Sequence, residues 1–92
     1  MNNSSLFLQM EKKKLEDALN HNLEILKNNE VEVNKIKEYL STLNLSEDEK
    51  EGFEFDIKVL NVQSREANKR IDEINIRLDY INEELSSLEL NK

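Results

Sequence analysis

The residue types that most often perform acid–base or metal chemistry are scarce in this chain. His21 is its single histidine, and none of its 92 residues is a cysteine. A general base needs an orienting partner and a substrate or nucleophile beside it, whereas the sequence neighbours of His21 are Asn20, Asn22 and Glu24. The Glu-x-x-His spacing of di-iron helical bundles is also missing, because Ala18 stands three residues before His21. We therefore expect no catalytic residue, no cofactor, no metal site and no enzymatic activity.

Acidic residues form the densest cluster of charged side chains. Only Lys50 balances them in a window that holds Glu47, Asp48, Glu49, Glu51, Glu54 and Asp56. Their spacing differs from that of an EF-hand calcium loop, although Gly52 lies among them. Two interpretations stay open. The acids match the positive end of a helix dipole and add solubility, or they form an acidic tip that enters a basic groove on another protein.

The elements that position these residues are predicted by a heptad pattern. In the second half of the chain, apolar residues recur at alternating steps of four and three, interrupted only by Ser64: Phe53, Ile57, Leu60, Ala67, Ile71, Ile74, Leu78, Ile81, Leu85 and Leu88. A less regular series in the first half consists of Leu8, Leu15, Leu19, Leu26, Val33, Ile36, Leu40 and Leu43, with Lys12, Asn22 and Asn29 at the same phase. A mean repeat of 3.5 residues keeps one stripe of a long helix against another helix. Because the chain has no proline and one glycine, the sequence predicts helices over about residues 5–43 and 47–90.

The turn between these helices is predicted at residues 44–46. Ser46 and Glu49 match a capping box, in which the Ser46 hydroxyl accepts the amide of residue 49 and the Glu49 carboxylate accepts the amide of Ser46. Asn44 is a candidate for a left-handed residue that ends the first helix. Gly52, near the start of the second helix, is a candidate for a local kink or a close helix contact.

The short connection between two long helices predicts an antiparallel hairpin. If the numbers of facing residues add up to 93, the chain folds back after Ser46 and the two heptad series face each other. Leu40 then faces Phe53, and Asn29 faces Ser64. A buried asparagine lowers stability but penalises shifted registers, so we interpret these polar residues as determinants of register.

Apolar residues outside the two heptad series predict an interaction surface. Phe55, Val59 and Val62 share a face of the second helix away from its seam. On the first helix, Tyr39, Ile25 and Leu23 are apolar residues that do not belong to the seam. A wide apolar face is typical of bundles with more than two helices, and an apolar patch beside charged residues marks a binding surface. We predict an all-α, coiled-coil-like, antiparallel two-helix hairpin that spans residues 1–92 as a single domain. It should dimerise into a four-helix bundle, or use the same surface for another helical protein.

The net charge of −7 argues against several kinds of partner. Repulsion from phosphate disfavours direct nucleic-acid binding, and anionic membrane surfaces are disfavoured for the same reason. No stretch approaches the roughly 20 apolar residues of a membrane span. The first residues lack the basic region and the apolar run of a secretion signal. These features favour a cytoplasmic location.

The sequence predicts a class of function. We expect a non-enzymatic protein–protein interaction module, which acts as an assembly subunit, an adaptor or a small chaperone. The alternative is a small acidic inhibitor, of the kind that mobile elements carry, whose acidic tip occupies a nucleic-acid-binding groove of its target. Steep weakening of partner binding by salt indicates the charge-based inhibitor, and indifference to salt indicates apolar helix docking.

Overall fold

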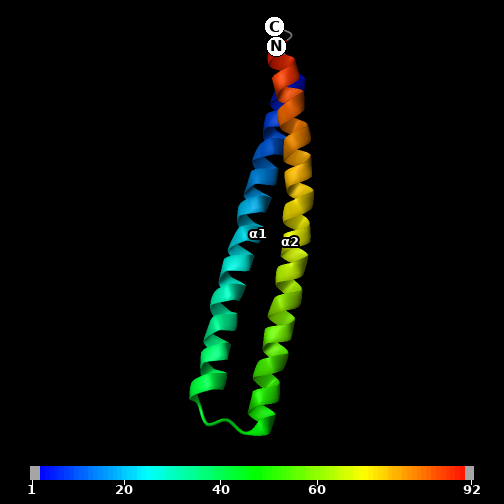
Figure 1. The fold of residues 1–92 in the computed structure, drawn as a ribbon. Helices are drawn as coiled ribbons and strands as arrows, with labels where there is room; N and C mark the ends of the chain where they lie inside the picture. The colour runs from blue at the N-terminus through cyan, green and yellow to red at the C-terminus, as the bar shows by residue number, and fades with distance from the viewer. Residues whose placement is uncertain (1–2, 91–92) are drawn as a thin grey trace.

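The computed structural model describes residues 3–90 and contains two long helices that run in opposite directions (Figure 1). Helix α1 spans Asn3–Thr42 and helix α2 spans Glu47–Leu90. The start of α1 and the end of α2 lie together at the open end of the hairpin, and the turn closes the other end (Figure 1). The molecule measures 69 × 16 × 15 Å, so it is a thin rod. The predicted all-helical hairpin is therefore confirmed, and the helix bounds agree with the predicted ones to within two residues.

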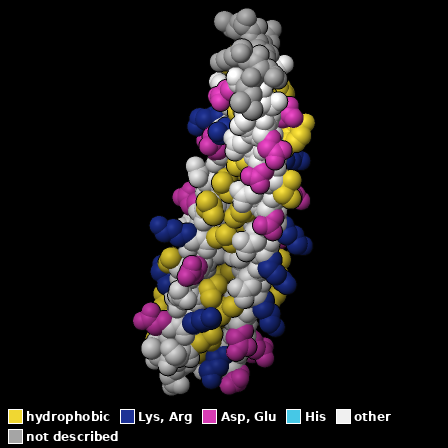
Figure 2. All heavy atoms as spheres, turned by 45° about the horizontal axis from the view of Figure 1, so that its top comes forward, with side chains coloured by type: hydrophobic (Ala, Val, Ile, Leu, Met, Phe, Trp, Pro, Cys, Tyr) yellow, Lys and Arg dark blue, Asp and Glu magenta, His cyan; other side chains and the backbone are white. Residues whose placement is uncertain are grey.

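The seam of α2 follows the predicted heptad series. From Phe53 to Leu88, every α2 side chain that is not exposed falls on that series, including Ser64. Ala67 is completely buried, and Ile74 and Ile81 are also buried. A space-filling view shows the resulting apolar stripe between the helices, with charged side chains along both borders (Figure 2). The seam thus supplies the interior of the hairpin, and most of the charged residues remain exposed to water.

The seam of α1 is also largely as predicted, with one correction and one addition. Ile36 is buried and the other predicted apolar positions as far as Leu40 are partly buried, but Leu43 is exposed. The reason is that α1 ends at Thr42, so Leu43 lies beyond the last turn that could direct its side chain toward α2. The addition is a second row of partly buried side chains beside the seam, seven residues apart: Glu11, Ala18 and Ile25.

Two hydrogen bonds confirm the predicted register. Asn29 Nδ2 donates to Ser64 Oγ at 3.2 Å and lies 3.4 Å from the Leu60 carbonyl oxygen. Seven residues earlier, Asn22 Nδ2 donates to the Ala18 carbonyl oxygen, 2.8 Å away. Both asparagines are buried, and the described residues contain no buried side-chain nitrogen or oxygen without a partner. Burial of their amides is therefore compensated by hydrogen bonds.

The predicted capping box is present at the start of α2. Glu49 N–H donates to Ser46 Oγ, and Ser46 N–H donates to Glu49 Oε1, each at 3.2 Å. These bonds satisfy two amide groups that a helix start otherwise leaves without partners. Glu47 and Asp48, which also lie in the first turn, match the positive end of the helix dipole.

The predicted left-handed stop at Asn44 is wrong. No described residue has a positive φ, so Asn44 does not end α1 in that way. Instead, Leu45 N–H donates to the Leu43 carbonyl oxygen at 3.1 Å, which makes an inverse γ-turn centred on Asn44. Leu43 N–H donates to the Tyr39 carbonyl oxygen at 2.9 Å and satisfies one of the last four acceptors of α1.

The predicted close helix contact at Gly52 is also wrong. A Cβ atom placed on this residue would meet no atom within 4 Å. Gly52 is exposed, its φ is not positive, and α2 continues through it without interruption. Neither packing nor backbone conformation therefore requires glycine at this position.

Candidate functional site

The hairpin leaves much of its apolar side-chain surface in contact with water. In the described part of the chain, twelve large apolar side chains are exposed: Leu6, Phe7, Met10, Leu23, Val31, Tyr39, Leu43, Phe55, Val59, Val62, Ile76 and Tyr80. No large side chain there is completely buried. Two helices can bury only one stripe each, because every other face of each helix points away from its partner. The candidate functional sites are therefore surfaces of the rod.

The outer face of α2 carries three of the predicted interface residues side by side. Phe55, Val59 and Val62 are 64%, 38% and 42% exposed. Phe55 lies two residues, or about 200° around the helix, from the seam residues Phe53 and Ile57. The three side chains therefore form one apolar patch on the side of α2 that faces away from α1.

The other three predicted interface residues lie on α1, beside the seam. Tyr39 is partly exposed and packs its ring against Phe53, with ring centroids 6.0 Å apart and planes tilted by 52°. Ile25 is partly buried and lines a groove. Leu23, two residues away, lies about 200° further around α1 and therefore flanks the opposite side of the seam. The six predicted residues thus occupy an outer face and two flanks, and no single surface brings them together.

We call the side of the rod that contains Ile25 the Ile25 flank. Its α1 residues are spaced by seven: Glu11, Ala18, Ile25, Glu32 and Tyr39. Its α2 residues have the same spacing: Glu49, Asp56, Gln63, Arg70, Arg77 and Glu84. Shared grooves show that the two rows lie on one side, because Ile25 lines a groove with Gln63 and Arg70, and Glu11 lines another with Arg77. Arg70 Nε also donates across this flank to Asn22 Oδ1, at 2.7 Å.

An apolar groove lies on the same side, at the open end of the hairpin. Its volume is about 460 Å³, and both helices line it: Phe7, Leu8, Glu11 and Leu15 from α1, and Ile76, Arg77, Tyr80 and Ile81 from α2. Phe7, Ile76 and Tyr80 are 60%, 70% and 62% exposed. None of these three was predicted as an interface residue from the sequence, because they come from two helices. Only the hairpin register brings Phe7 near Ile76 and Tyr80.

The acidic tip surrounds the first turns of α2. All six of its acidic residues are exposed: Glu47, Asp48, Glu49, Glu51, Glu54 and Asp56. Glu49 takes part in the capping box, and Glu47 lies 3.7 Å from Lys50. Helical geometry places Glu47, Glu51 and Glu54 along one side of α2, while Asp56 points about 180° away from Glu47. The tip is therefore acidic on more than one side.

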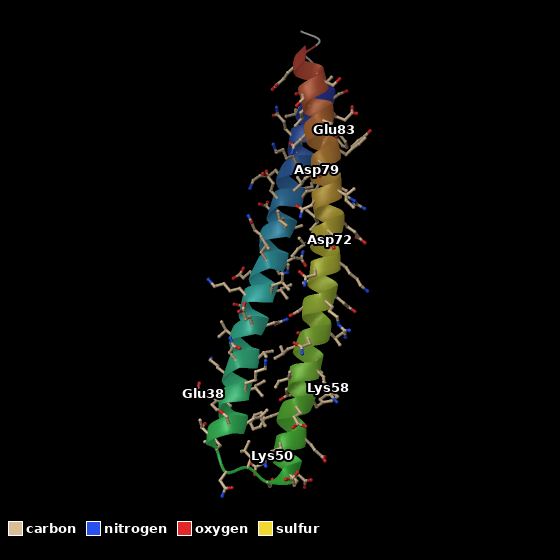
Figure 3. All side chains as sticks on the ribbon, in the orientation of Figure 1. Glu38, Lys50, Lys58, Asp72, Asp79 and Glu83 are labelled. Carbon is tan, nitrogen blue, oxygen red and sulfur yellow. The ribbon has the colours of Figure 1, made fainter. Side chains whose placement is uncertain are left out.

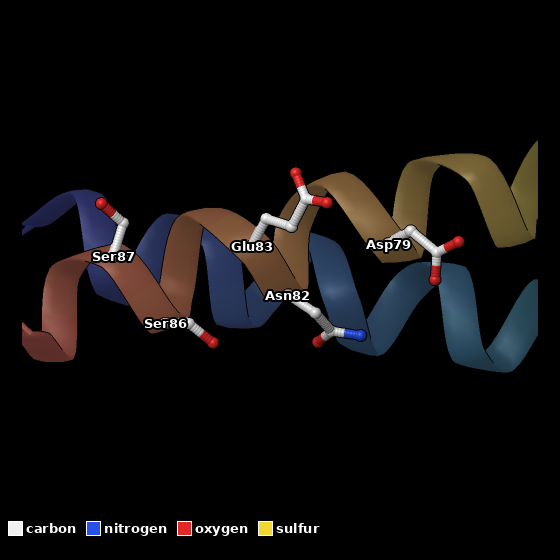
Figure 4. Close-up of a pocket in the computed structure, with 5 residues that line it drawn as sticks. All are labelled: Asp79, Asn82, Glu83, Ser86 and Ser87. Carbon is white, nitrogen blue, oxygen red and sulfur yellow. The ribbon is translucent and has the colours of Figure 1, made fainter.

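Polar side chains project into solvent from both helices along the rod (Figure 3). A shallow groove on α2 near the open end is lined by Asp79, Asn82, Glu83, Ser86 and Ser87, all from that one helix (Figure 4). His21 is exposed on α1. Lys13 Nζ donates to Asp17 Oδ1 at 3.0 Å, which raises the pKa of Lys13 above its ordinary value. Within residues 3–90, no three histidine or acidic side chains come close enough together to hold a metal ion.

The chain has no recognisable similarity to known proteins. No family model, no curated protein and no solved structure matches it. Neither of the described helices combines the length and apolar character that crossing a bilayer requires. The surfaces of the hairpin itself are therefore the guide to its function.

Proposed function

We propose that this chain is a non-enzymatic protein–protein interaction module of the cytoplasm. Its hairpin self-associates into a four-helix bundle and offers the outer face of α2 to another helical protein, as an assembly subunit, adaptor or small chaperone does. The observation that carries this proposal is the imbalance between a thin seam and many exposed large apolar side chains. Contiguous exposed apolar surface marks protein–protein contact sites more often than it occurs by chance.

The second row of partly buried residues on α1 supports association with further helices. A helix in a two-stranded coiled coil shows two apolar positions per heptad, whereas a helix in a four-helix bundle adds a third. Ala18 and Ile25 occupy this third position. Packing against a second hairpin would bury them and would shield the seam from water.

Light scattering coupled to size-exclusion chromatography tests self-association. We expect a mass near twice the 10.9 kDa of one chain. A fully folded monomer at micromolar concentration would show that the exposed apolar surface is not needed for stability, and the dimer proposal would fail.

Affinity capture with paired variants tests the outer face of α2. Phe55→Glu/Val62→Glu should abolish the capture of a partner, because two charges would replace apolar contacts. Asn61→Glu/Asn68→Glu is the matched control, since it adds the same charge at two exposed α2 positions with the same spacing. Equal capture by the two variants would show that Phe55, Val59 and Val62 are not the binding surface.

The acidic tip supports the second candidate function, a charge-based inhibitor. Its six carboxylate side chains are exposed and point to more than one side, so a basic groove could contact several of them at once. A salt titration of partner binding distinguishes the two functions. The inhibitor should lose affinity steeply between low and physiological salt, whereas apolar docking on α2 should change little.

A further inference from the structure

We propose that two copies of this chain pack side by side in opposite directions through the Ile25 flank. In this dimer Ile25 faces Ile25 of the second copy, and each Tyr39 lies beside the open-end groove of the other hairpin. The inference rests on the proposed self-association and adds its surface and direction.

The two flanks of the seam differ, and only one resembles a helix-packing surface. On the Ile25 flank, Glu11, Ala18 and Ile25 are partly buried beside the seam. On the opposite flank, α1 presents five exposed residues, of which only one is apolar: Gln9, Glu16, Leu23, Glu30 and Lys37. There α2 presents a row of four exposed asparagines: Asn61, Asn68, Asn75 and Asn82. Both flanks present polar residues from α2, so the distinction comes from α1, where a row beside the seam is partly buried only on the Ile25 flank.

The spacing along α1 fits a second copy in the reverse direction. The α1 residues of the flank are symmetric about Ile25, because Glu11 and Tyr39 both lie 14 residues away from it. This separation corresponds to about 21 Å along the helix on either side. A two-fold axis at Ile25 therefore brings Tyr39 of one copy to the level of Glu11 of the other. Glu11 stands at the apolar groove formed by Phe7, Ile76 and Tyr80.

The charges along α2 fit the same axis. In the reverse direction, the α2 row of the flank pairs Asp56 with Arg77 of the second copy, Gln63 with Arg70, and Glu49 with Glu84. The midpoint of this row lies between residues 66 and 67, which the hairpin register places opposite residues 26 and 27. This level is within about 2 Å of Ile25 along the rod. One axis therefore fits both helices. It makes two opposite-charge pairs between Asp56 and Arg77 near the middle of the rod, and two like-charge pairs between Glu49 and Glu84 nearer its ends.

Long-range charge and contact area also favour this arrangement. Packing in the same direction would place two acidic tips side by side, whereas the reverse direction keeps the two tips at opposite ends of the dimer. A standard interface covers about 800 Å² of each partner, which over a rod 69 Å long is a strip about 12 Å wide. The hairpin is 15–16 Å across, so one flank can supply that area.

Single cysteine substitutions test which flank is used, because the natural chain contains no cysteine. Ile25→Cys should form a disulfide-linked dimer on mild oxidation, since the two Cβ atoms meet at the axis. Leu23→Cys is the matched control on the opposite flank and should remain monomeric on a non-reducing gel. Cross-linking of the Leu23→Cys variant, or of neither variant, would overturn the assignment of the Ile25 flank and leave self-association standing. A monomeric natural chain would overturn the proposed function itself.

Charge reversal tests the direction of packing. Asp56→Arg and Arg77→Glu should each weaken dimerisation by about tenfold, because each creates two like-charge contacts. Asp56→Arg/Arg77→Glu should restore most of the natural affinity, because the pairs re-form with exchanged signs. In a same-direction dimer these positions of different copies would lie about 30 Å apart, and the double variant would show no rescue. If both single variants dimerise weakly and the double variant does not regain affinity, the reverse orientation is contradicted.

Discussion

At the scale of single residues, hydrogen bonds reduce the free-energy penalty of burying polar side chains in the seam. Asn29 bonds to Ser64, and Asn22 bonds both to its own helix and to Arg70. A shift of one helix along the other would separate Asn29 from Ser64 and leave buried amide groups unpaired. Unpaired buried groups are more costly than a lost contact, so these residues select one register over its neighbours.

Gly52→Ala should stabilise the hairpin by about 1 kcal/mol, because alanine loses less backbone entropy in a helix and its Cβ would enter open space. Urea unfolding, followed by circular dichroism at fixed protein concentration, measures the change. Glu51→Ala serves as the neighbouring control and should change stability little. An unfolding midpoint that is unchanged or lower in Gly52→Ala would show that glycine has a role at this position that the fold does not reveal.

Ser46→Ala should destabilise the hairpin by about 1 kcal/mol, because the Glu49 amide loses its acceptor. Glu49→Ala should also destabilise it, since the Ser46 amide then loses its carboxylate partner. The two bonds belong to one motif, so the double variant should lose less than the sum of the single losses. Thermal unfolding of the four proteins measures this coupling. Strictly additive losses would contradict a cooperative capping box.

At the scale of elements, Ala67 is the most completely buried residue of the seam. This residue is completely buried, while the leucine and isoleucine residues along much of the same seam are only partly buried. The hairpin register places Ala67 opposite Leu26, so a small residue faces a large one. Alternation of large and small side chains lets two helices interlock at this level.

Ala67→Leu should therefore destabilise the hairpin by roughly 1–3 kcal/mol, because the larger side chain would push the helices apart. Asn68→Leu is the adjacent control on an exposed position and should leave stability nearly unchanged. Urea unfolding of both variants gives the comparison. If Ala67→Leu were as stable as the natural chain or more stable, the seam would have room for a larger side chain at this position.

Most of the fold follows from patterns within the sequence. The heptad phases and the capping box independently indicate the same fold-back point, and the bond between Asn29 and Ser64 confirms the register. The end of α1 could not be predicted as well, because several local turns satisfy the last carbonyl groups. The sequence favoured a left-handed Asn44, whereas the chain uses an inverse γ-turn at Asn44 and a hydrogen bond from the Leu43 amide to the Tyr39 carbonyl oxygen.

The candidate surfaces were less predictable than the fold. Helical spacing correctly groups Phe55, Val59 and Val62, because they share one helix. The same spacing also places Leu23 and Ile25 on opposite sides of the seam, but the sequence prediction grouped them because it collected the remaining apolar residues without comparing their phases. The open-end groove depends on residues from both helices, so it emerges only when the register is applied to Phe7, Ile76 and Tyr80 together.

At the scale of the whole molecule, the hairpin is a thin rod with an unequal charge distribution. It is 69 Å long and at most 16 Å across, so almost every residue lies near the surface. The net charge of −7 opposes association, and six acidic residues are concentrated at the tip. A stable dimer must therefore gain from apolar contacts and must keep the two tips apart. Reverse packing along the Ile25 flank satisfies both requirements.

Small-angle X-ray scattering of the natural chain tests self-association and side-by-side packing most directly, because one measurement gives both mass and length. We expect a mass near twice 10.9 kDa, together with a maximum dimension only slightly above the 69 Å of one hairpin. A particle of 10.9 kDa would contradict self-association through the exposed apolar surfaces. A doubled mass with a length near twice 69 Å would contradict side-by-side packing.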